Sequence, residues 1–378
     1  MKSNGHKRTN VLVTGAKGFI GKNLVVALRR RSDVNIIEYD IDSPAEVLEK
    51  ALMEADVIHH LAGVNRPERI EAFREGNVDL TAQVCDALRQ SGRSPLFVLS
   101  SSTQAALENP YGVSKRQAEE IVFDFGRDTG ASVFVFRFPG IFGKWCKPHY
   151  NSVVATFCHN IAHDRPIAIS DPAREIELVY VDDVIQAFMD IMDGRLPVSD
   201  GRYCRVERTF RVALGVLADT IKGFRESRVS LEVPDMSEPF LHALYGTYIS
   251  YLPTDSFTYA LAQRTDSRGE LAELLKSPQC GQFFVSRTRP GVTRGNHYHD
   301  TKVEKFIVID GEAVIRFRSV LGGNIIEYPV SGHEFRVVDI PPGYTHSIKN
   351  VGQNDLIVLF WADEVFDECN PDTFGMTV

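Results

Sequence analysis

The strongest constraint on the fold is a change in the hydrophobic pattern near residue 245. Before this point, continuous apolar runs alternate with helix-like segments; after it, short apolar runs follow one another between Gly, Pro and Asp residues. A chain of 378 residues also exceeds the roughly 250–300 residues at which one hydrophobic core stops growing. We therefore predict two domains, 1–245 and 246–378, with a linker or bridging segment within 230–260.

The first domain is predicted to be a doubly wound α/β fold. Its apolar runs are rich in β-branched and aromatic residues, as in strands that are buried on both faces of a parallel sheet. Helical patterns lie between these runs, which indicates βαβ units. The predicted strands span 10–15, 34–40, 56–63, 95–102 and 132–140, and the clearest predicted helices span 21–31 and 76–92.

The second domain is predicted to be all-β. Turn signals recur about every dozen residues, which is typical of an antiparallel barrel or jelly roll. Asp310-Gly311 separates two apolar runs, and this dipeptide predicts a two-residue β-hairpin.

Composition excludes several classes of protein. The net charge of −8 leaves no basic excess for neutralising nucleic-acid phosphates. No apolar run reaches the roughly 18 residues of a membrane span, and "MKSNGHKRTN" lacks the apolar core of a signal peptide. The six cysteines are scattered without a CxxC pair, which favours a reducing compartment. We expect a cytoplasmic protein.

A glycine-rich turn, "VTGAKGFIG", follows the first predicted strand and opens a helix. Gly15, Gly18 and Gly21 allow a tight turn and close approach of a pyrophosphate to the helix N-terminus. Asp40 ends the second strand, where a carboxylate usually accepts from the ribose 2′-OH of NAD. Lys17 would instead suit the 2′-phosphate of NADP. The local pattern favours NAD slightly and leaves NADP open.

Tyr111 and Lys115 are four residues apart, so they share one face of a helix. A neighbouring ammonium group favours the phenolate and lowers the pKa of a tyrosine. Such a tyrosine exchanges a proton with a carbinol oxygen while a hydride moves at the carbon. Hydroxyls of residues 100–103, at the end of the fourth strand, are placed to orient the carbonyl.

Residues 10–230 resemble the extended short-chain dehydrogenase/reductase family. The resemblance is carried by the glycine turn, "HLAG" (60–63), Asn77, the strand-end serines, Tyr111, Lys115, "RFPGIFG" (137–143) and "LVYVDDV" (178–184). It implies a nicotinamide cofactor, NAD(H) or NADP(H). The implied cofactor-binding residues are Gly15, Lys17, Gly18, Phe19, Ile20, Gly21, Asp40, Leu61, Ala62, Gly63, Tyr111 and Lys115.

The same resemblance implies roles in catalysis. Tyr111 would be the acid/base, Lys115 would bind the nicotinamide ribose, and Ser101 or Ser102 would bind the substrate carbonyl. A nucleoside-diphosphate sugar would lie over a substrate subdomain at about 144–230, and Asn151, Ser152 and Arg174 would contact it. Dehydratases of this family carry an Asp-Glu pair after the strand-end hydroxyl. Thr103-Gln104-Ala105 stands there instead, which favours a reductase or a 4-epimerase.

His297, His299 and Glu304 form a second candidate site. Residues i and i+2 of a strand point to the same face, so the two imidazoles converge. Glu304 has the wrong parity and reaches them only if 300–302 turns the chain and Glu304 opens the next strand.

This segment and "PPGYTHSIKN" resemble the two cupin motifs, G(X)5HXH(X)4E(X)6G and PXG(X)2H(X)3N. The resemblance implies a jelly-roll barrel in which His297, His299, Glu304 and His346 bind one divalent metal. Three His and one Glu suit Zn²⁺, Fe²⁺, Mn²⁺ or Ni²⁺. A purely structural metal remains an alternative.

The region before the first of these histidines is similar to the sugar-nucleotide 3,5-epimerases of the same barrel class. The shared residues are Asp266, Arg268, Gly269, Arg294 and Gly295. A 4-keto sugar has an acidic hydrogen at C3, and a metal on the keto oxygen would stabilise the enolate. The acid/base candidates, which the sequence does not separate, are Tyr298, Tyr344, Lys302 and Lys305.

The whole chain resembles the bifunctional capsular-polysaccharide synthesis enzymes of the CapF/WbjC type. Segments that carry this likeness include "HLAGVNRPE", "GKWCKPHYNSV", "TYISYLP" and "RGNHYHDTKVEKF". Membership implies C3 epimerisation of a UDP-2-acetamido-2,6-dideoxy-4-hexulose by a zinc-bearing cupin domain. Reduction at C4 with NADPH would then give UDP-2-acetamido-2,6-dideoxy-β-L-talose, on the way to UDP-N-acetyl-L-fucosamine. It also implies a homodimer.

Two other functions remain open at this stage. The barrel could be only a binding or dimerisation module beside a plain reductase. Alternatively, the protein could be a non-catalytic sensor of a sugar nucleotide.

Overall fold

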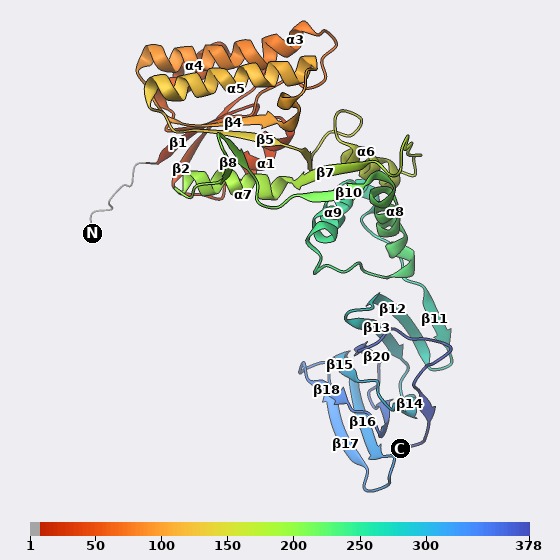
Figure 1. Cartoon of the computed structure of the whole chain (residues 1–378). Helices are drawn as coiled ribbons and strands as arrows, with labels where there is room; N and C mark the ends of the chain where they lie inside the picture. The colour runs from red at the N-terminus through yellow and green to blue at the C-terminus, as the bar shows by residue number, and fades with distance from the viewer. Residues whose placement is uncertain (1–7) are drawn as a thin grey trace, which may run out of the picture. The chain divides into compact units, whose positions relative to one another are not determined.

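The computed structural model describes residues 8–378 (Figure 1). The chain divides into two compact units. The first unit ends at Ile221 and also includes Ala243–Leu252; the second comprises Lys222–His242 and Pro253–Val378. The first is α/β and the second is all-β apart from its helical lead-in, as the hydrophobic pattern predicts.

The first unit is built on a seven-stranded sheet with the order β2-β1-β3-β4-β5-β9-β8. Strands β1 to β5 and β9 pair in parallel, and β8 runs antiparallel to β9 at one edge. All five predicted strands are confirmed. The strands are β1 (Thr9–Thr14), β2 (Val34–Tyr39), β3 (Val57–His60), β4 (Leu96–Ser102), β5 (Val133–Phe138), β8 (Val198–Asp200) and β9 (Tyr203–Arg205).

Helices cover both faces of this sheet, with α4 and α5 side by side on one face and α7 on the other (Figure 1). Val11 and Val13 of β1 pack with α1 and α7, whereas Leu12 packs with α2, α4 and α5. Alternate residues therefore enter two different cores, which explains the continuous apolar runs. The helices are α1 (Phe19–Leu28), α2 (Ala45–Glu54), α4 (Leu80–Ser91), α5 (Pro110–Thr129) and α7 (Val181–Met192).

A three-stranded sheet with the order β10-β7-β6 and three further helices complete the helical part of the chain. Their bounds are β6 (Gly140–Phe142), β7 (Glu175–Tyr180), β10 (Phe210–Ala213), α6 (Val153–Ala162), α8 (Leu214–Ser230) and α9 (Pro239–Ile249). Short helical turns are α3 (Glu71–Phe73), η1 (Arg74–Asp79), η2 (Thr103–Ala106) and η3 (Thr254–Ser256).

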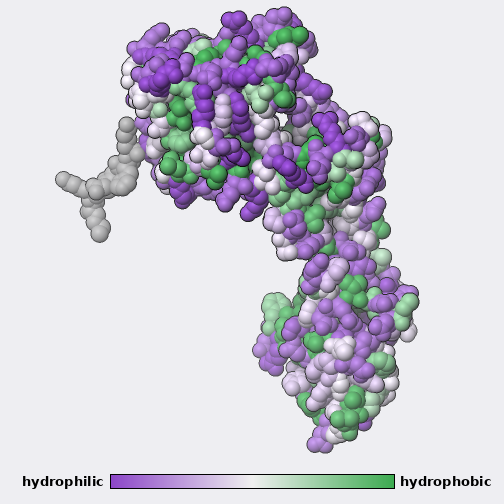
Figure 2. Space-filling model, viewed as in Figure 1, coloured by the Kyte–Doolittle hydropathy of each residue, from purple (hydrophilic) through white to green (hydrophobic). Residues whose placement is uncertain are grey.

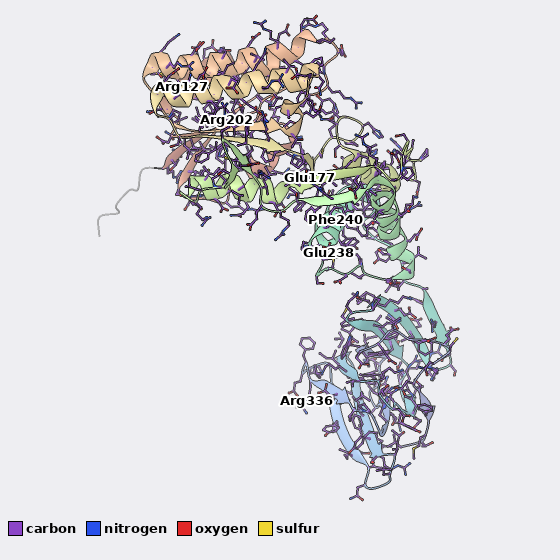
Figure 3. The ribbon with its side chains drawn as sticks, viewed as in Figure 1. Arg127, Glu177, Arg202, Glu238, Phe240 and Arg336 are labelled. Carbon is purple, nitrogen blue, oxygen red and sulfur yellow. The ribbon has the colours of Figure 1, made fainter. Side chains whose placement is uncertain are left out.

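Helix α9 lies inside the segment that the sequence predicts to be a linker. Pro239 is its first residue, where a missing N–H costs nothing. The Glu238 carboxylate accepts from the backbone N–H groups of Phe240 and Leu241 at 2.9 and 3.2 Å, and both Glu238 and Phe240 are labelled in Figure 3. The prolines that suggest a linker therefore flank a helix.

The second unit contains two antiparallel sheets around one apolar core. The first sheet holds β11 (Gln263–Asp266), β12 (Gly269–Ser277), β13 (Gly281–Thr288), β20 (Leu356–Ala362), β15 (Glu304–Asp310) and β18 (Val337–Ile340). The second sheet holds β17 (Ile326–Ser331), β16 (Glu312–Ser319), β19 (Tyr344–Asn350), β14 (Thr293–Tyr298) and β21 (Phe374–Gly375). The core includes Phe306, Ile315, Phe317, Ile340 and Val358.

The hairpin predicted at Asp310-Gly311 is wrong. The two residues do connect β15 to β16, but β15 pairs with β18 and β20, whereas β16 pairs with β17 and β19. The turn therefore carries the chain from one sheet to the other. Gly311 has φ +91°, and a Cβ there would lie 3.0 Å from the Asp355 carbonyl oxygen. Gly311 is therefore needed where the chain passes from one sheet to the other, and not for a hairpin.

Hydrophilic residues cover much of the visible face of each unit, with hydrophobic residues in smaller groups (Figure 2). Across residues 8–378, no helix has the length and apolar character required to span a membrane.

Candidate functional site

The first candidate site lies at the carboxyl ends of the parallel strands. In the sheet, β2 lies on one side of β1 and β3 lies on the other, so the strand order reverses at β1. Ligands of open α/β sheets bind at such a reversal. Gly15 has φ +68°, and a Cβ there would lie 2.7 Å from the Ala62 backbone nitrogen. A Cβ on Gly21 would lie 2.1 Å from the Gly15 carbonyl oxygen. Only glycine fits at either position.

Helix α1 begins directly after this turn. Its N-cap, Gly18, offers no side chain to accept from the first N–H groups, so these donors remain for a phosphate. The side chains of Phe19 and Ile20 pack against the core.

Asp40 and Lys17 are both engaged within the turn. Asp40 Oδ2 accepts from the Lys17 backbone N–H at 2.7 Å, so the carboxylate holds the glycine-rich turn against the end of β2. The Lys17 ammonium is hydrogen-bonded to Asp42, which raises the pKa of Lys17 and lowers that of Asp42. The spacing between the glycine turn and Asp40 gave no sign of Asp42, which bonds Lys17 in the structure.

The loop after β3 forms the other wall of this edge. Ala62 donates its N–H to Thr14 Oγ1 at 3.2 Å, and Leu61 packs against the core. Asn77 accepts from the Val64 N–H at 2.8 Å and donates to the Val64 carbonyl at 2.9 Å. A Cβ on Gly63 would lie 2.8 Å from Asn77 Oδ1, so Asn77 holds the predicted cofactor loop 61–63 in place.

Tyr111 and Lys115 lie on the first turns of α5, next to the end of β4. Lys115 Nζ donates to the Ser100 carbonyl oxygen at 2.6 Å. Burial lowers the pKa of Lys115 to about 8, although the charge of Glu119 opposes this shift. The lowered pKa predicted for Tyr111 is wrong for the structure as described, because burial raises it and only a hydrogen bond with Ser102 opposes the rise.

The structure separates the two candidate serines. Ser101 is buried, and its hydroxyl donates to Glu119. Glu119 is fully buried and also accepts from Arg137 Nε and Nη2 at 2.9 and 2.6 Å. Ser101 therefore belongs to a buried ion-pair network, whereas Ser102 contacts Tyr111. Ser102 is the hydroxyl that the structure brings to Tyr111, the predicted acid/base residue.

The predicted substrate residues lie in separate places. Ser152 is the N-cap of α6, and its hydroxyl accepts from the Ala155 N–H at 3.2 Å. Asn151 precedes it and is exposed, and Arg174 is exposed at the start of β7. Tyr150, within the segment 144–157 that the sequence indicates as a substrate contact, is close enough to Tyr111 to raise its pKa.

The second candidate site lies in the barrel. His297, on β14, is opposite His346, on β19, in the strand register. His299 follows β14, and Glu304 is the first residue of β15, so the predicted turn at 300–302 is confirmed. One potential ligand atom from each of the four residues lies within 4.8 Å of the others. His299 Nε2 and His346 Nε2 lie 3.3 and 3.5 Å from Glu304 Oε2.

Electrostatics favour a bound cation at this cluster. Burial raises the pKa of Glu304, but the neighbouring imidazoles of His299 and His346 outweigh this effect and lower the value to about 2. Burial and the neighbouring His346 lower the pKa of His297 to about 4. A carboxylate with a neutral imidazole beside it is the state that ligates a metal.

Several side-chain atoms of the four residues lack a hydrogen-bond partner, as expected of atoms that bind a metal. Among residues 8–378, His299 Nε2, Glu304 Oε2 and His346 Nε2 are buried side-chain atoms without a hydrogen-bond partner. His299 Nδ1 donates to the Asp372 carbonyl oxygen at 2.6 Å, which leaves the Nε2 lone pair directed at the cluster. Buried polar atoms are normally paired, so a divalent ion accounts for three that are not.

The four acid/base candidates of the barrel differ in their surroundings. Lys302 Nζ donates to the Pro371 carbonyl at 2.7 Å, and the Lys305 ammonium pairs with Asp339 on an exposed face. Tyr298 stacks on Phe374 with the ring centroids 5.3 Å apart. Tyr344 packs against the apolar core and, two residues before His346 on β19, shares its face.

Two parts of the chain match known family models. Residues 11–197 match the NAD dependent epimerase/dehydratase family. Residues 264–374 match the polysaccharide biosynthesis C-terminal domain.

Three relatives match the chain over nearly its whole length. UDP-2-acetamido-2,6-beta-L-arabino-hexul-4-ose reductase of Pseudomonas aeruginosa is 46% identical over 97% of this chain and 98% of its own. The crystal structure of the capsular polysaccharide assembling protein CapF from Staphylococcus aureus is 44% identical, with a TM-score of 0.92, over 98% of this chain and 100% of that one. A structure of CapF with the inhibitor 3-isopropenyl-tropolone is 40% identical, with a TM-score of 0.87, over the same shares of the two chains. The predicted fold class, a reductase-type Rossmann domain followed by a cupin jelly roll, is confirmed.

Proposed function

The chain belongs to the family of the Pseudomonas aeruginosa hexul-4-ose reductase and Staphylococcus aureus CapF, and from this premise we propose that it reduces a UDP-linked 4-keto sugar for capsular polysaccharide synthesis. The proposed substrate is a UDP-2-acetamido-2,6-dideoxy-4-hexulose. The barrel (246–378) epimerises it at C3, and the first domain (1–245) then reduces C4. The product is UDP-2-acetamido-2,6-dideoxy-L-talose, a precursor of UDP-N-acetyl-L-fucosamine.

In the reductase step, Tyr111 donates a proton to the C4 oxygen and Ser102 donates a hydrogen bond to it. The bound nicotinamide cofactor supplies the hydride. Lys115, whose ammonium now bonds the Ser100 carbonyl, binds the nicotinamide ribose. Gly15 to Gly21 and residues 61–63 hold the dinucleotide. We propose NADPH, with Lys17 released from Asp42 to meet the 2′-phosphate.

In the epimerase step, His297, His299, Glu304 and His346 would hold a divalent ion, proposed to be zinc. When bound, the ion would supply a Lewis acid for the sugar keto group. Tyr344 takes the C3 proton from one face of the sugar, because it shares the face of His346, and solvent water returns a proton to the opposite face. Lys302, Lys305 and Tyr298 are each engaged elsewhere.

The observation that carries the two-step proposal is the set of buried, unpartnered ligand atoms in the barrel. The same chain also brings Ser102 to Tyr111, four residues before Lys115 on α5. The inhibitor seen with CapF adds support. Tropolones carry adjacent keto and hydroxyl oxygens, which chelate divalent metals. Epimerisation must precede reduction, since only the ketone makes the C3 hydrogen acidic.

The test is incubation with the 4-keto UDP-sugar in deuterated water, with and without NADPH and with and without a chelator. We expect deuterium at C3 without NADPH, no exchange after chelation, and reduced sugar when NADPH is present. NMR of the sugar distinguishes these outcomes. Exchange that is absent in every arm contradicts the epimerase and leaves a plain reductase; NADPH that is never consumed contradicts the reductase and favours a sensor.

The assignment of Tyr344 has a matched control. Tyr344→Phe should slow C3 exchange by about 10²–10⁴-fold, whereas Tyr298→Phe should leave it near the wild-type rate. Equal rates in the two variants would refute Tyr344 as the acid/base.

A further inference from the structure

Asp372 makes most of the contacts of the turn that joins two of the candidate metal ligands. Its carboxylate accepts from the backbone N–H groups of Asp300, Thr301 and Lys302 at 2.9, 3.0 and 2.8 Å. It also accepts from Thr301 Oγ1 at 3.1 Å. The carboxylate therefore joins three successive residues of the turn.

The three N–H groups belong to the turn between His299 and Glu304. These two ligands come together only because residues 300–302 reverse the chain. The sequence alone leaves open what holds that turn, because it contains no glycine or proline. In the structure, the carboxylate of Asp372 holds the turn by accepting from the Lys302 N–H, 70 residues earlier in the chain.

The main chain of the same residue orients one ligand directly. The Asp372 carbonyl oxygen accepts from His299 Nδ1 at 2.6 Å. This hydrogen bond selects the tautomer with its lone pair on Nε2, the nitrogen 3.3 Å from Glu304 Oε2. Asp372 has φ +41°, so the backbone turns sharply at the point where side chain and carbonyl both reach the ligand loop.

The rest of the segment Pro371–Val378 ties down the remaining ligand strands. Its strand β21 pairs with β14, with Gly375 opposite His297. The Thr345 hydroxyl, next to His346, donates to the Met376 carbonyl. The buried Lys302 ammonium donates to the Pro371 carbonyl at 2.7 Å and to Thr373 Oγ1 at 3.3 Å. The segment therefore contacts His297 and His299 directly, Thr345 next to His346, and Lys302 two residues before Glu304.

We propose that Asp372 is the positioning residue of the barrel site and that segment 371–378 acts as a clasp that sets its metal affinity. This inference rests on the proposed metal site. Lys302 is part of the clasp rather than a proton carrier. Partners behind metal ligands typically contribute about 10–100-fold in metal affinity. Asp372 makes one such contact through its carbonyl and holds the turn between two ligands through its carboxylate.

The experiment measures zinc binding by competition with a chromophoric chelator, using the full chain. Asp372→Ala should weaken zinc binding by about 10–100-fold, and Asp372→Asn, which keeps the shape but loses the charge, should weaken it less. Asp367→Asn is the matched control. Asp367 Oδ1 accepts from the Cys369 N–H at 2.9 Å in the same part of the chain but is not bonded to the ligand loop.

The absorption bands of the Co²⁺-loaded protein report on the geometry of the metal ligands, so a residue that contributes only to stability would not shift them. They should shift in the Asp372 variants and remain unchanged in Asp367→Asn, while thermal unfolding of the metal-free proteins confirms that all of them fold. Zinc affinity and cobalt bands equal to those of Asp367→Asn would overturn the proposal, as would a wild-type protein that binds neither ion.

The outcome is independent of the proposed reaction. Absent C3 exchange in the wild type, together with weakened zinc binding in Asp372→Ala, would refute the epimerase and leave the clasp standing. Normal C3 exchange in the wild type, together with unchanged zinc binding in Asp372→Ala, would refute the clasp and leave the epimerase standing.

Discussion

The two candidate sites treat buried polar groups in opposite ways. At the α/β site, the buried Lys115 ammonium bonds the Ser100 carbonyl, and the buried Glu119 accepts from Ser101 and Arg137. In the barrel, His299 Nε2 and Glu304 Oε2 are among the described buried atoms that lack a partner. A buried polar group without a partner costs about 1–3 kcal/mol. The buried groups named at the first site are therefore paired within the protein, whereas those of the second would gain partners from an ion.

This difference teaches how each site relates to its ligand. A site whose own groups are already paired can bind and release a dinucleotide in each turnover without loss of structure. A site that leaves several ligand atoms unpaired gains stability from its ion, by mass action on the folded state. Substitutions at one site should therefore leave the other unchanged.

Tyr111→Phe should have the largest effect on reduction. The variant lacks the proton donor, which typically contributes about 10²–10⁴-fold, so NADPH oxidation with the 4-keto substrate should fall by this factor. C3 exchange and zinc content should be unchanged. A parallel loss of C3 exchange would show that the two sites are coupled.

His297→Ala should remove the metal and with it C3 exchange. We expect a loss of metal affinity greater than the about 10–100-fold typical of residues behind the ligands, because an inner ligand is deleted. Metal analysis and deuterium incorporation measure the two effects. NADPH affinity, measured by fluorescence titration, should equal that of the wild type; a weaker value would contradict independent sites.

Ser102→Ala and Ser101→Ala should separate catalysis from stability. Loss of the Ser102 hydroxyl should slow reduction by about 10²-fold, as for other donors to a developing oxyanion. Loss of the Ser101 hydroxyl should leave the rate within a few-fold but lower the free energy of unfolding by about 1–3 kcal/mol, because the buried Glu119 loses a donor. Steady-state rates and urea unfolding test the pair, and the opposite pattern would reassign the carbonyl partner to Ser101.

Lys115 should produce the smallest effect, seen as a pH dependence. Its folded pKa of about 8 lies below the ordinary value of 10.5, so between these pH values the unfolded chain binds more protons than the folded one. The resulting stabilisation is present above about pH 10.5 and is lost as pH falls through about 8. Wild type should therefore gain stability relative to Lys115→Met as pH rises through this window.

The activity should respond in the opposite direction to pH. The ammonium form of Lys115 binds the cofactor ribose, so reduction should decline as pH rises through about 8. C3 exchange in the barrel should not follow the same curve. Identical pH profiles for the two activities would argue for a shared rate-limiting group.

Much of this molecule could be predicted from short-range patterns. The five parallel strands were visible because burial on both faces produces continuous apolar runs. Tyr111 with Lys115, and His297 with His299, were visible because helix and strand periods place those side chains together. Helix α9 was missed because prolines at its ends outweighed the apolar run between them, and the Asp310-Gly311 turn was misread because a local dipeptide does not show which sheet the next strand joins.

What the sequence determined by itself is therefore the inventory of strands, turns and chemical groups, since these follow from spacings of a few residues. The tertiary structure decided which groups meet. It turned Ser101 toward Glu119 and Ser102 toward Tyr111, and it set the pKa of Tyr111 by burial rather than by Lys115. It also brought Asp372 against the turn after His299, 73 residues earlier. Contacts at such separations depend on how sheets pack around a core, and no local pattern of residues encodes that.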